Sequence, residues 1–440
     1  MNRWKEMYRS KLTTPDEAVK LVEPGDYVML PFANGIPPAL LEALASRLRN
    51  GDLSDIHFFG GLTVQDSSIF DFDLAPKMLL EANFLGAQLR KGTQEGVFTF
   101  NPMRLSEYVP IMLARQLNGV IVQRVAPMDK HGFLSTGTDC EYIWEVVKKH
   151  PRKPKLILEV NEYMPRTLGN NQFHISEVSA VIEHNTPLVS LPPNDITDVD
   201  RTIAGYIAEM VEDESCLQLG IGRIPNAVAL FLKEKRDLGI HTEMLVDSMV
   251  DLYEAGAVTC AKKNFMPNRW VATFALGSQK LYDFIDDNPM VEMLSAAFVN
   301  DPINIAKNDC MVSVNSTLEV DLTGQCNSES IGYRQYSGTG GQLDFVQGAV
   351  RSRGGKSFLT LYSTYTDKEG NLKSRIVPRL SDGATVTVPR TDVQYVVSEY
   401  GVASLRGKHV RQRVEELINI AHPDYRDYLR SEARRMNFIP

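Results

Sequence analysis

Residues 237–256 read DLGIHTEMLVDSMVDLYEAG, and this stretch predicts a short strand followed by a helix. Short apolar residues lead into Glu243. The side chains of Asp247 and Ser248 can then cap a helix, and Gly256 can end that helix. Rigid elements on both sides would hold the Glu243 carboxylate at a fixed geometry, as a reactive group requires. An ordinary surface glutamate in a strand-to-helix turn has the same local sequence, so this stretch alone leaves both interpretations open.

The same alternation of short apolar segments and helical segments continues through the chain. Predicted strands are 26–30, 57–59, 82–84, 97–100, 119–124, 155–160, 216–219, 271–276, 311–315, 358–362 and 384–388. Predicted helices are 16–22, 107–115, 139–148, 202–211, 279–285 and 410–420, and a turn is predicted at 398–401. This alternation predicts an α/β fold rather than an all-α or all-β fold.

The length of 440 residues favours two or three domains. Residues 187–199 (PLVSLPPNDITDV) are rich in proline and have little periodicity, so they are a linker or a long loop. We therefore expect one domain over 1–195 and another over 196–440. The strand-to-helix junctions at 35–41 (GIPPALL) and 223–229 (RIPNAVA) look alike, which indicates either two related halves or a chance match.

Composition excludes several classes of protein. The chain is 43% hydrophobic and 23% charged, its net charge is −8, and it contains no long basic run. We therefore expect no nucleic-acid or anionic-membrane partner. No apolar run is long enough to cross a bilayer, and the first ten residues, MNRWKEMYRS, have no apolar secretory core.

Cysteine and histidine patterns suggest neither disulfides nor a metal. The five cysteines are scattered and form no C-x-x-C pair, which indicates reduced thiols in a cytoplasmic protein. The eight histidines lack H-E-x-x-H or a comparable spacing, so we expect no metal site. There is no G-x-S-x-G motif to support serine-hydrolase chemistry.

Two glycine-rich turns offer backbone N–H groups for an anionic ligand. Residues 220–225 (GIGRIP) follow a predicted strand and open a predicted helix, where amides can bind a phosphate or an oxyanion. Pro225 stands where a dinucleotide fingerprint requires its third glycine, which argues against NAD binding. Residues 337–345 (SGTGGQLDF) form the densest glycine cluster, which is either a ligand loop or a tight turn. Together with Glu243, these turns suggest a carboxylate nucleophile and amide stabilisation of an oxyanion.

These motifs resemble the acetyl-CoA hydrolase/transferase family. The resemblance rests on residues 220–228, 239–256, 337–345 and 418–423 (INIAHP). These motifs occur in the same order as in the family, and the resemblance covers nearly the whole chain. Within the family, the chain is similar above all to 4-hydroxybutyrate and butyryl-CoA:acetate CoA-transferases. The resemblance implies two related α/β domains of the CoA-transferase (NagB/RpiA-like) type, with the active site in the cleft between them and Glu243 as the catalytic residue.

The resemblance also assigns roles to other residues, and each assignment is an expectation. Those implied to bind CoA are Gly220, Ile221, Gly222, Arg223, Ile224, Gly340, Gly341 and Leu361. Those implied to contact the substrate acids are Asn34, Gly35, Asn315 and Glu399, with residues 34–38 lining the acyl pocket. No permanently bound cofactor and no metal are implied, because coenzyme A enters as part of the substrate. A homodimer or higher homo-oligomer is implied.

The implied reaction transfers CoA from an acyl-CoA to a small carboxylic acid by ping-pong kinetics through a glutamyl-CoA thioester on Glu243. Residues 32–35 and 58–61 depart from the 4-hydroxybutyrate enzymes, and they fall in the half that should build the acyl pocket. Acetate, butyrate, 4-hydroxybutyrate and a dicarboxylate such as itaconate or succinate are therefore all open as substrates. An acyl-CoA hydrolase on the same scaffold is the alternative, followed by a non-catalytic CoA-binding protein and an NAD-dependent oxidoreductase.

Overall fold

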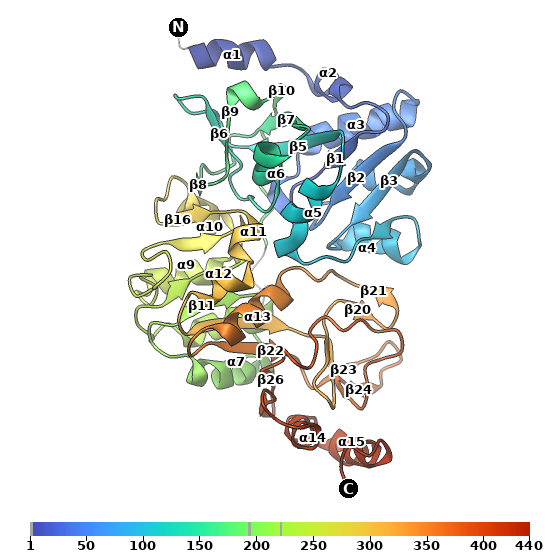
Figure 1. Cartoon of the computed structure of the whole chain (residues 1–440), viewed down its shortest axis with the longest axis vertical. Coiled ribbons are helices and arrows are strands. Elements are labelled where there is room, and N and C mark those ends of the chain that lie inside the picture. Colours follow the sequence, from blue (N-terminus) through green and yellow to red (C-terminus); the bar gives the residue numbers. More distant parts are fainter. Residues whose placement is uncertain (1–2, 192–194, 221) are drawn as a thin grey trace. The chain divides into compact units, whose positions relative to one another are not determined.

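The computed structural model describes residues 3–191, 195–220 and 222–440 (Figure 1). Contacts divide the chain into two compact units, both discontinuous in sequence. Unit 1 comprises 1–192, 243–247 and 269–299, and unit 2 comprises 193–242, 248–268 and 300–440. A division after residue 195 assigns segments 243–247 and 269–299 to the second domain, whereas the contacts group them with unit 1. Residues 192–194 of the predicted linker lie outside the described residues.

The main sheet of unit 1 has seven strands in the order β10-β7-β5-β1-β2-β3-β4, all parallel. Its strands are β1 (Tyr27–Met29), β2 (Ile56–Gly60), β3 (Met78–Ala82), β4 (Thr99–Phe100), β5 (Gly119–Val125), β7 (Lys155–Val160) and β10 (Ala180–Glu183). Every residue of β5 is buried, as expected for a strand near the centre of a parallel sheet. Figure 1 shows β10, β7, β5, β1, β2 and β3 side by side in blue to green.

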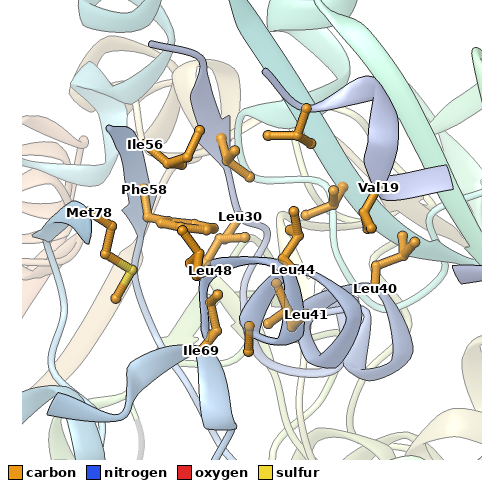
Figure 2. Close-up of a cluster of buried hydrophobic side chains, with 14 of the residues drawn as sticks. Val19, Leu30, Leu40, Leu41, Leu44, Leu48, Ile56, Phe58, Ile69 and Met78 are labelled. Carbon is orange, nitrogen blue, oxygen red and sulfur yellow. The ribbon is translucent and has the colours of Figure 1, made fainter. Parts of the chain in front are cut away.

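Helix α3 (Pro38–Asn50) supplies the largest apolar face against this sheet. Its buried leucines are Leu40, Leu41, Leu44 and Leu48, which recur at helical spacing and belong to one apolar cluster, where Leu48 lies beside Phe58 and Leu40 beside Val19 (Figure 2). Each fully buried leucine contributes about 1.5–3 kcal/mol of hydrophobic stabilisation. Pro38 starts the helix, and Gly51 ends it in a left-handed conformation with φ of 84°. The packing therefore fixes the loop that precedes α3.

Small strands bring Glu243 into unit 1. β13 (Met244–Leu245) pairs in parallel with β15 (Phe274–Ala275). Next to them β14 (Trp270–Ala272), β16 (Val291–Met293) and β8 (Leu168–Gly169) form a three-stranded parallel sheet. The other α-helices and strands of unit 1 are α1 (Arg3–Lys11), α2 (Pro15–Ala18), α4 (Ala87–Gln94), α5 (Tyr108–Ala114), β6 (Phe133–Ser135), α6 (Ile143–Lys149), β9 (Gln172–His174), α10 (Gln279–Ile285) and α11 (Ala296–Val299).

Unit 2 contains a six-stranded sheet in the order β12-β11-β17-β22-β26-β27. Its strands are β11 (Cys216–Leu219), β12 (Gly239–Ile240), β17 (Met311–Ser316), β22 (Lys356–Thr360), β26 (Tyr395–Ser398) and β27 (Gly401–Ser404). All neighbours are parallel except β26 and β27, which form a hairpin. The helices of this unit are α7 (Asp198–Met210), α8 (Arg223–Phe231), α12 (Pro302–Ala306), α13 (Gln342–Arg351), α14 (Val410–Asn419) and α15 (Pro423–Arg435); α9 (Asp247–Glu254) begins at the last residue of segment 243–247.

Short strand pairs complete unit 2. They are β18 (Glu319–Asp321) with β19 (Cys326–Asn327) and β25 (Ile376–Val377), β20 (Ser330–Ile331) with β21 (Arg334–Gln335), and β23 (Thr364–Thr366) with β24 (Leu372–Ser374). A second apolar core lies among β18, β22, β26, α14 and α15. Among the described residues, no helix is both long and apolar enough to cross a membrane.

The α/β prediction is confirmed, but three predicted elements are wrong. The predicted strand 82–84 overlaps β3 only at Ala82. The predicted helix 139–148 begins only at Ile143, because residues 138–140 are hydrogen-bonded to Thr273 and Ala275. Residues 384–388 form no strand, since only Val388 makes a β-bridge there, with Cys326. Contacts that are distant in sequence thus override local patterns at the last two of these sites.

Candidate functional site

Four predicted site residues lie at the same edge of the unit 2 sheet. Gly220 follows β11, Asn315 lies near the end of β17, Leu361 follows β22, and Glu399 follows β26. These four strands are adjacent and parallel, with Leu219 opposite Val314, Asn315 opposite Leu359, and Thr360 opposite Val397. Because their carboxyl ends meet at one edge, the four residues are brought together there, where open α/β sheets bind ligands.

Side chains at this edge are held by paired hydrogen bonds. The amides of Asn315 and Gln218 bind each other reciprocally, at 3.0 and 3.3 Å. One carboxylate oxygen of Glu399 accepts from the Ser363 hydroxyl at 2.5 Å, and the other accepts from the Ser363 backbone N–H at 2.9 Å. The Leu361 N–H donates to the carbonyl of Val397 at 3.0 Å. The edge is therefore a prearranged set of polar groups.

The glycine loop after β11 reaches the same edge. The Gly220 N–H donates to the Val314 carbonyl at 2.9 Å. Gly222 adopts φ of 131° and ψ of −179°, a conformation essentially limited to glycine, and it precedes the first turn of α8. Arg223 is exposed, whereas Ile224 is buried at 5% exposure. Ile221 lies outside the described residues.

An acid and a tyrosine face Arg223. The Tyr362 hydroxyl donates to the carboxylate of Asp200 at 2.6 Å. Burial and the Asp200 charge raise the pKa of Tyr362 to about 12, although Arg223 acts in the opposite direction. Burial opposes ionisation of Asp200, but hydrogen bonds from Tyr362 and Thr197, together with the charge of Arg223, lower the pKa of its carboxyl. At neutral pH the loop arginine therefore faces an ionised carboxylate and a neutral tyrosine.

The second glycine turn lies beside the end of β17. Gly340 has φ of 53°, and Gly341 occupies the N-cap position of α13. The Gln342 side-chain amide donates to the Ser316 carbonyl at 2.7 Å, which ties the start of α13 to the sheet edge. Upstream, the Thr339 hydroxyl donates to Glu329 at 2.9 Å. The predicted CoA-binding residues that the structure describes thus converge within unit 2.

Glu243 belongs to unit 1 and is partly exposed. Its backbone carbonyl accepts from the N–H groups of Thr273 and Phe274, at 3.0 and 3.2 Å. Helix α9 begins four residues later at Asp247, and the Asp247 carboxylate accepts from the N–H and hydroxyl of Ser278 at 2.9 and 2.5 Å. Pairing of β13 with β15 and the Asp247–Ser278 contacts therefore hold the segment that carries Glu243 on both sides.

Asn34 and Gly35 lie in a short 3₁₀ turn of unit 1 (Ala33–Gly35), between β1 and α3. The Asn34 amide donates to the Tyr282 hydroxyl at 2.8 Å and to the Val189 carbonyl at 3.1 Å, and it accepts from the Val189 N–H at 2.8 Å. Its side chain is 2% exposed, so these contacts fix the turn from within. Gly35 is also buried.

Several residues at these positions were not predicted from the sequence. Asp200, Tyr362 and Ser363 are partners of predicted residues and belong to no motif, so only the fold reveals them. Asp139 and Glu141 were hidden because their segment was predicted to be helical. Within the described part of the chain, no group of three or more His, Cys, Asp and Glu residues is arranged to hold a metal.

Comparison with known proteins gives matches along nearly the whole chain. The N-terminal domain of the acetyl-CoA hydrolase/transferase family matches residues 1–193, and the C-terminal domain of that family matches residues 277–433. Succinyl-CoA:cyclohexane-1-carboxylate CoA transferase of Geobacter metallireducens is 46% identical, with 99% of this chain and 98% of that protein covered. Butyryl-CoA:acetate CoA-transferase of Anaerostipes caccae is 41% identical, with 98% of each covered.

Solved structures agree with the fold. RipA from Yersinia pestis superposes with a TM-score of 0.92 at 38% identity, covering 99% of this chain and 100% of that one. A 4-hydroxybutyrate CoA-transferase from Porphyromonas gingivalis superposes with a TM-score of 0.83 at 34% identity, again with 99% and 100% covered. The predicted CoA-transferase-type α/β fold is therefore confirmed.

Proposed function

The chain belongs to the acetyl-CoA hydrolase/transferase family and is an enzyme that transfers CoA. We propose that Glu243 carries CoA between an acyl-CoA and a small carboxylic acid. The observation that carries the proposal is the convergence of Gly220, Asn315, Leu361 and Glu399 on the carboxyl edge of one parallel sheet. The glycine turns add backbone N–H groups that suit the oxyanion of a thioester adduct.

In the proposed first step, a carboxylate oxygen of Glu243 attacks the thioester carbonyl. The carbon–sulfur bond breaks, CoA leaves as a thiolate, and an acyl-glutamyl anhydride remains. The thiolate then attacks the glutamyl carbonyl, which releases the first acid as a carboxylate and leaves a glutamyl-CoA thioester. A second carboxylate repeats these steps in reverse, so no net proton or electron is consumed and the kinetics are ping-pong.

This chemistry gives the rigid setting of Glu243 a purpose. A carboxylate is a weak nucleophile, and fixed orientation can supply several kcal/mol of the barrier reduction. The backbone contacts of Glu243 with Thr273 and Phe274, and of Asp247 with Ser278, support such orientation. Binding of the remote CoA tail can add to this by favouring the strained reacting geometry.

We propose acids of the kinds used by relatives as the substrates: acetate, butyrate, 4-hydroxybutyrate, or a dicarboxylate such as succinate or itaconate. The names of two relatives, which pair succinyl-CoA with cyclohexane-1-carboxylate and butyryl-CoA with acetate, support both mono- and dicarboxylates. A homodimer in the cytoplasm completes the proposal. The free state of all five cysteines is consistent with that compartment, and light scattering of the purified chain tests the dimer.

The experiment that separates transfer from hydrolysis measures loss of an acyl-CoA with and without an acceptor acid. A transferase turns the ester over beyond one equivalent per enzyme only when an acceptor is present, and it then forms one new acyl-CoA for each one consumed. Acceptor-independent release of free CoA at a comparable rate would instead establish an acyl-CoA hydrolase, an activity that the family name also includes.

A further inference from the structure

Two acidic side chains are buried behind the turn that carries Asn34. Asp139 and Glu141 are 2% and 0% exposed. Both carboxyl groups accept the same backbone N–H, that of Phe32, at 2.9 Å each. The second oxygen of Glu141 has no hydrogen-bond partner. Buried acids without a basic partner are costly, so their presence here requires an explanation.

The turn is shaped to fit these acids. A Cβ atom on Gly35 would lie 2.1 Å from a carboxylate oxygen of Asp139 and 2.9 Å from the side-chain nitrogen of Gln123. Gly35 does not need a left-handed conformation, because its φ is not positive. Glycine is therefore required at this position for space, and the space is occupied by Asp139.

The same acidic segment is bound on its other side to the strand beside Glu243. The N–H of Cys140 donates to Thr273 and the carbonyl of Thr138 accepts from Ala275, each at 2.8 Å. Thr273 in turn donates its N–H to the carbonyl of Glu243 at 3.0 Å. A continuous set of hydrogen bonds within unit 1 thus leads from the Phe32 N–H through the acidic segment to the Glu243 backbone.

The pair retains a proton at neutral pH. Burial raises the pKa of Asp139 to about 6, and hydrogen bonds from Glu141, Phe32 and Gln123 limit that rise. Burial, then the charge of Asp139, raises the pKa of Glu141 well above its ordinary value. A protonated Glu141 that donates to an ionised Asp139 satisfies both observations.

Other titratable groups near the pair do not supply a counter-charge. Cys140 and Tyr142 lie close enough to the pair for the charges of Asp139 and Glu141 to raise their pKa values; Tyr27 and Tyr108 act on Tyr142, and Glu145 acts on Cys140. The pKa values of Cys140 and Tyr142 are themselves raised by burial, so both stay neutral at neutral pH. Among the described residues, no arginine or lysine is among the main causes that set the pKa of either acid.

We propose that Asp139 and Glu141 are positioning residues that hold the Phe32–Gly35 turn at a fixed place relative to the Glu243 segment. The role rests on the proposed CoA transfer by Glu243. Loss of the shared proton at high pH puts two negative charges in one buried site, which loosens the turn and lowers transfer. Glu141→Gln keeps a donor to Asp139 and cannot ionise. Asp139→Asn replaces an acceptor oxygen by a donor NH₂ group and leaves Glu141 as the acid of the pair that can carry the charge. The second carboxylate oxygen of Glu141 has no hydrogen-bond partner to stabilise that charge.

The test measures kcat/KM for acceptor-dependent transfer from pH 6 to 9 in the full-length protein and three variants. We expect Glu141→Gln to keep kcat/KM within about threefold at pH 7 and to lose the alkaline decline of the wild type. Asp139→Asn should lower kcat/KM at least about tenfold, mainly through kcat, because the turn is misplaced. The control is Glu145→Gln, which changes an acid that pairs with Lys149 instead and should leave the profile unchanged.

A second measurement needs no substrate. The folded protein raises the pKa of Glu141 above its unfolded value, which is near 4.3. As the pH rises above that value, the unfolded state loses this proton while the folded state keeps it, so the folded state becomes progressively less stable relative to the unfolded state. The Tm of Glu141→Gln minus that of the wild type should therefore increase from pH 5 to 9. If the Tm difference between Glu141→Gln and the wild type does not change with pH, the inference that Asp139 and Glu141 share a proton is overturned. Parallel kcat/KM profiles, or equal losses in Glu141→Gln and Asp139→Asn, overturn the positioning role while transfer itself stands. Absence of transfer in the wild type overturns the proposed function and this role with it.

Discussion

Gly35→Ala tests whether the packing behind the Asn34 turn is as tight as the structure shows. The added methyl group would lie 2.1 Å from Asp139 and 2.9 Å from Gln123, far inside ordinary contact distance. The nearest obstacle is a carboxylate held by the Phe32 N–H at 2.9 Å, so it cannot swing away without losing that hydrogen bond. Either the turn or the carboxylate must move.

Overpacking of this kind costs about 1–3 kcal/mol in a buried site. For a folding unit of roughly 150–250 residues, each kcal/mol lowers Tm by about 2–4 °C, so we expect a fall of about 2–12 °C. Differential scanning calorimetry of the wild type and variant measures it. The variant should also lose transfer activity, because the displaced turn carries Asn34.

Gly205→Ala is the matched control. Gly205 lies in α7 with no atom within 4 Å of an added Cβ, so alanine should be tolerated and raise stability by about 0.5–1 kcal/mol. An unchanged Tm in Gly35→Ala, or a fall no larger than any change in Gly205→Ala, would show that the space beside Asp139 is not filled as described.

Two further variants test the unit 2 sheet edge. Gly341→Val adds a branched side chain at the N-cap of α13, and we expect kcat/KM for the acyl-CoA to fall because backbone approach to the ligand is blocked; an unchanged value would remove this turn from the site. Tyr362→Phe removes the 2.6 Å hydrogen bond to Asp200 that faces Arg223, so we expect a stability loss of about 1 kcal/mol and a several-fold higher KM for the acyl-CoA. An unchanged KM in that variant would show that the Tyr362–Asp200 hydrogen bond beside Arg223 does not contribute to CoA binding.

Local sequence predicted the elements that are continuous and strongly apolar. The predicted bounds 155–160, 216–219 and 279–285 coincide with β7, β11 and α10, where the pattern and the tertiary structure favour the same conformation. The segment at 139–148 shows the opposite case. Its spacing suits a helix, but Thr138 and Cys140 hydrogen-bond to residues more than a hundred positions later, and no local pattern encodes that contact.

The site was predicted unevenly for the same reason. Gly220, Asn315 and Glu399 were assigned by resemblance, and the parallel sheet explains why they share an edge. The grouping of Glu243 with unit 1 was not predicted, because it depends on β13 pairing with β15, about thirty residues further on. Positioning groups such as Asp139 carry no motif, since their role comes from burial and from neighbours that are distant in sequence.

The central claim is that Glu243 forms a covalent intermediate with CoA. The most direct measurement is the intact mass of the protein after brief incubation with an acyl-CoA and an acid quench, followed by peptide mapping, with Glu243→Ala treated in parallel. We predict that the wild type gains the mass of CoA less one water on the peptide that contains Glu243. Glu243→Ala should stay folded, gain no mass and transfer no CoA. An adduct on another residue, or transfer activity retained by Glu243→Ala, would contradict the account.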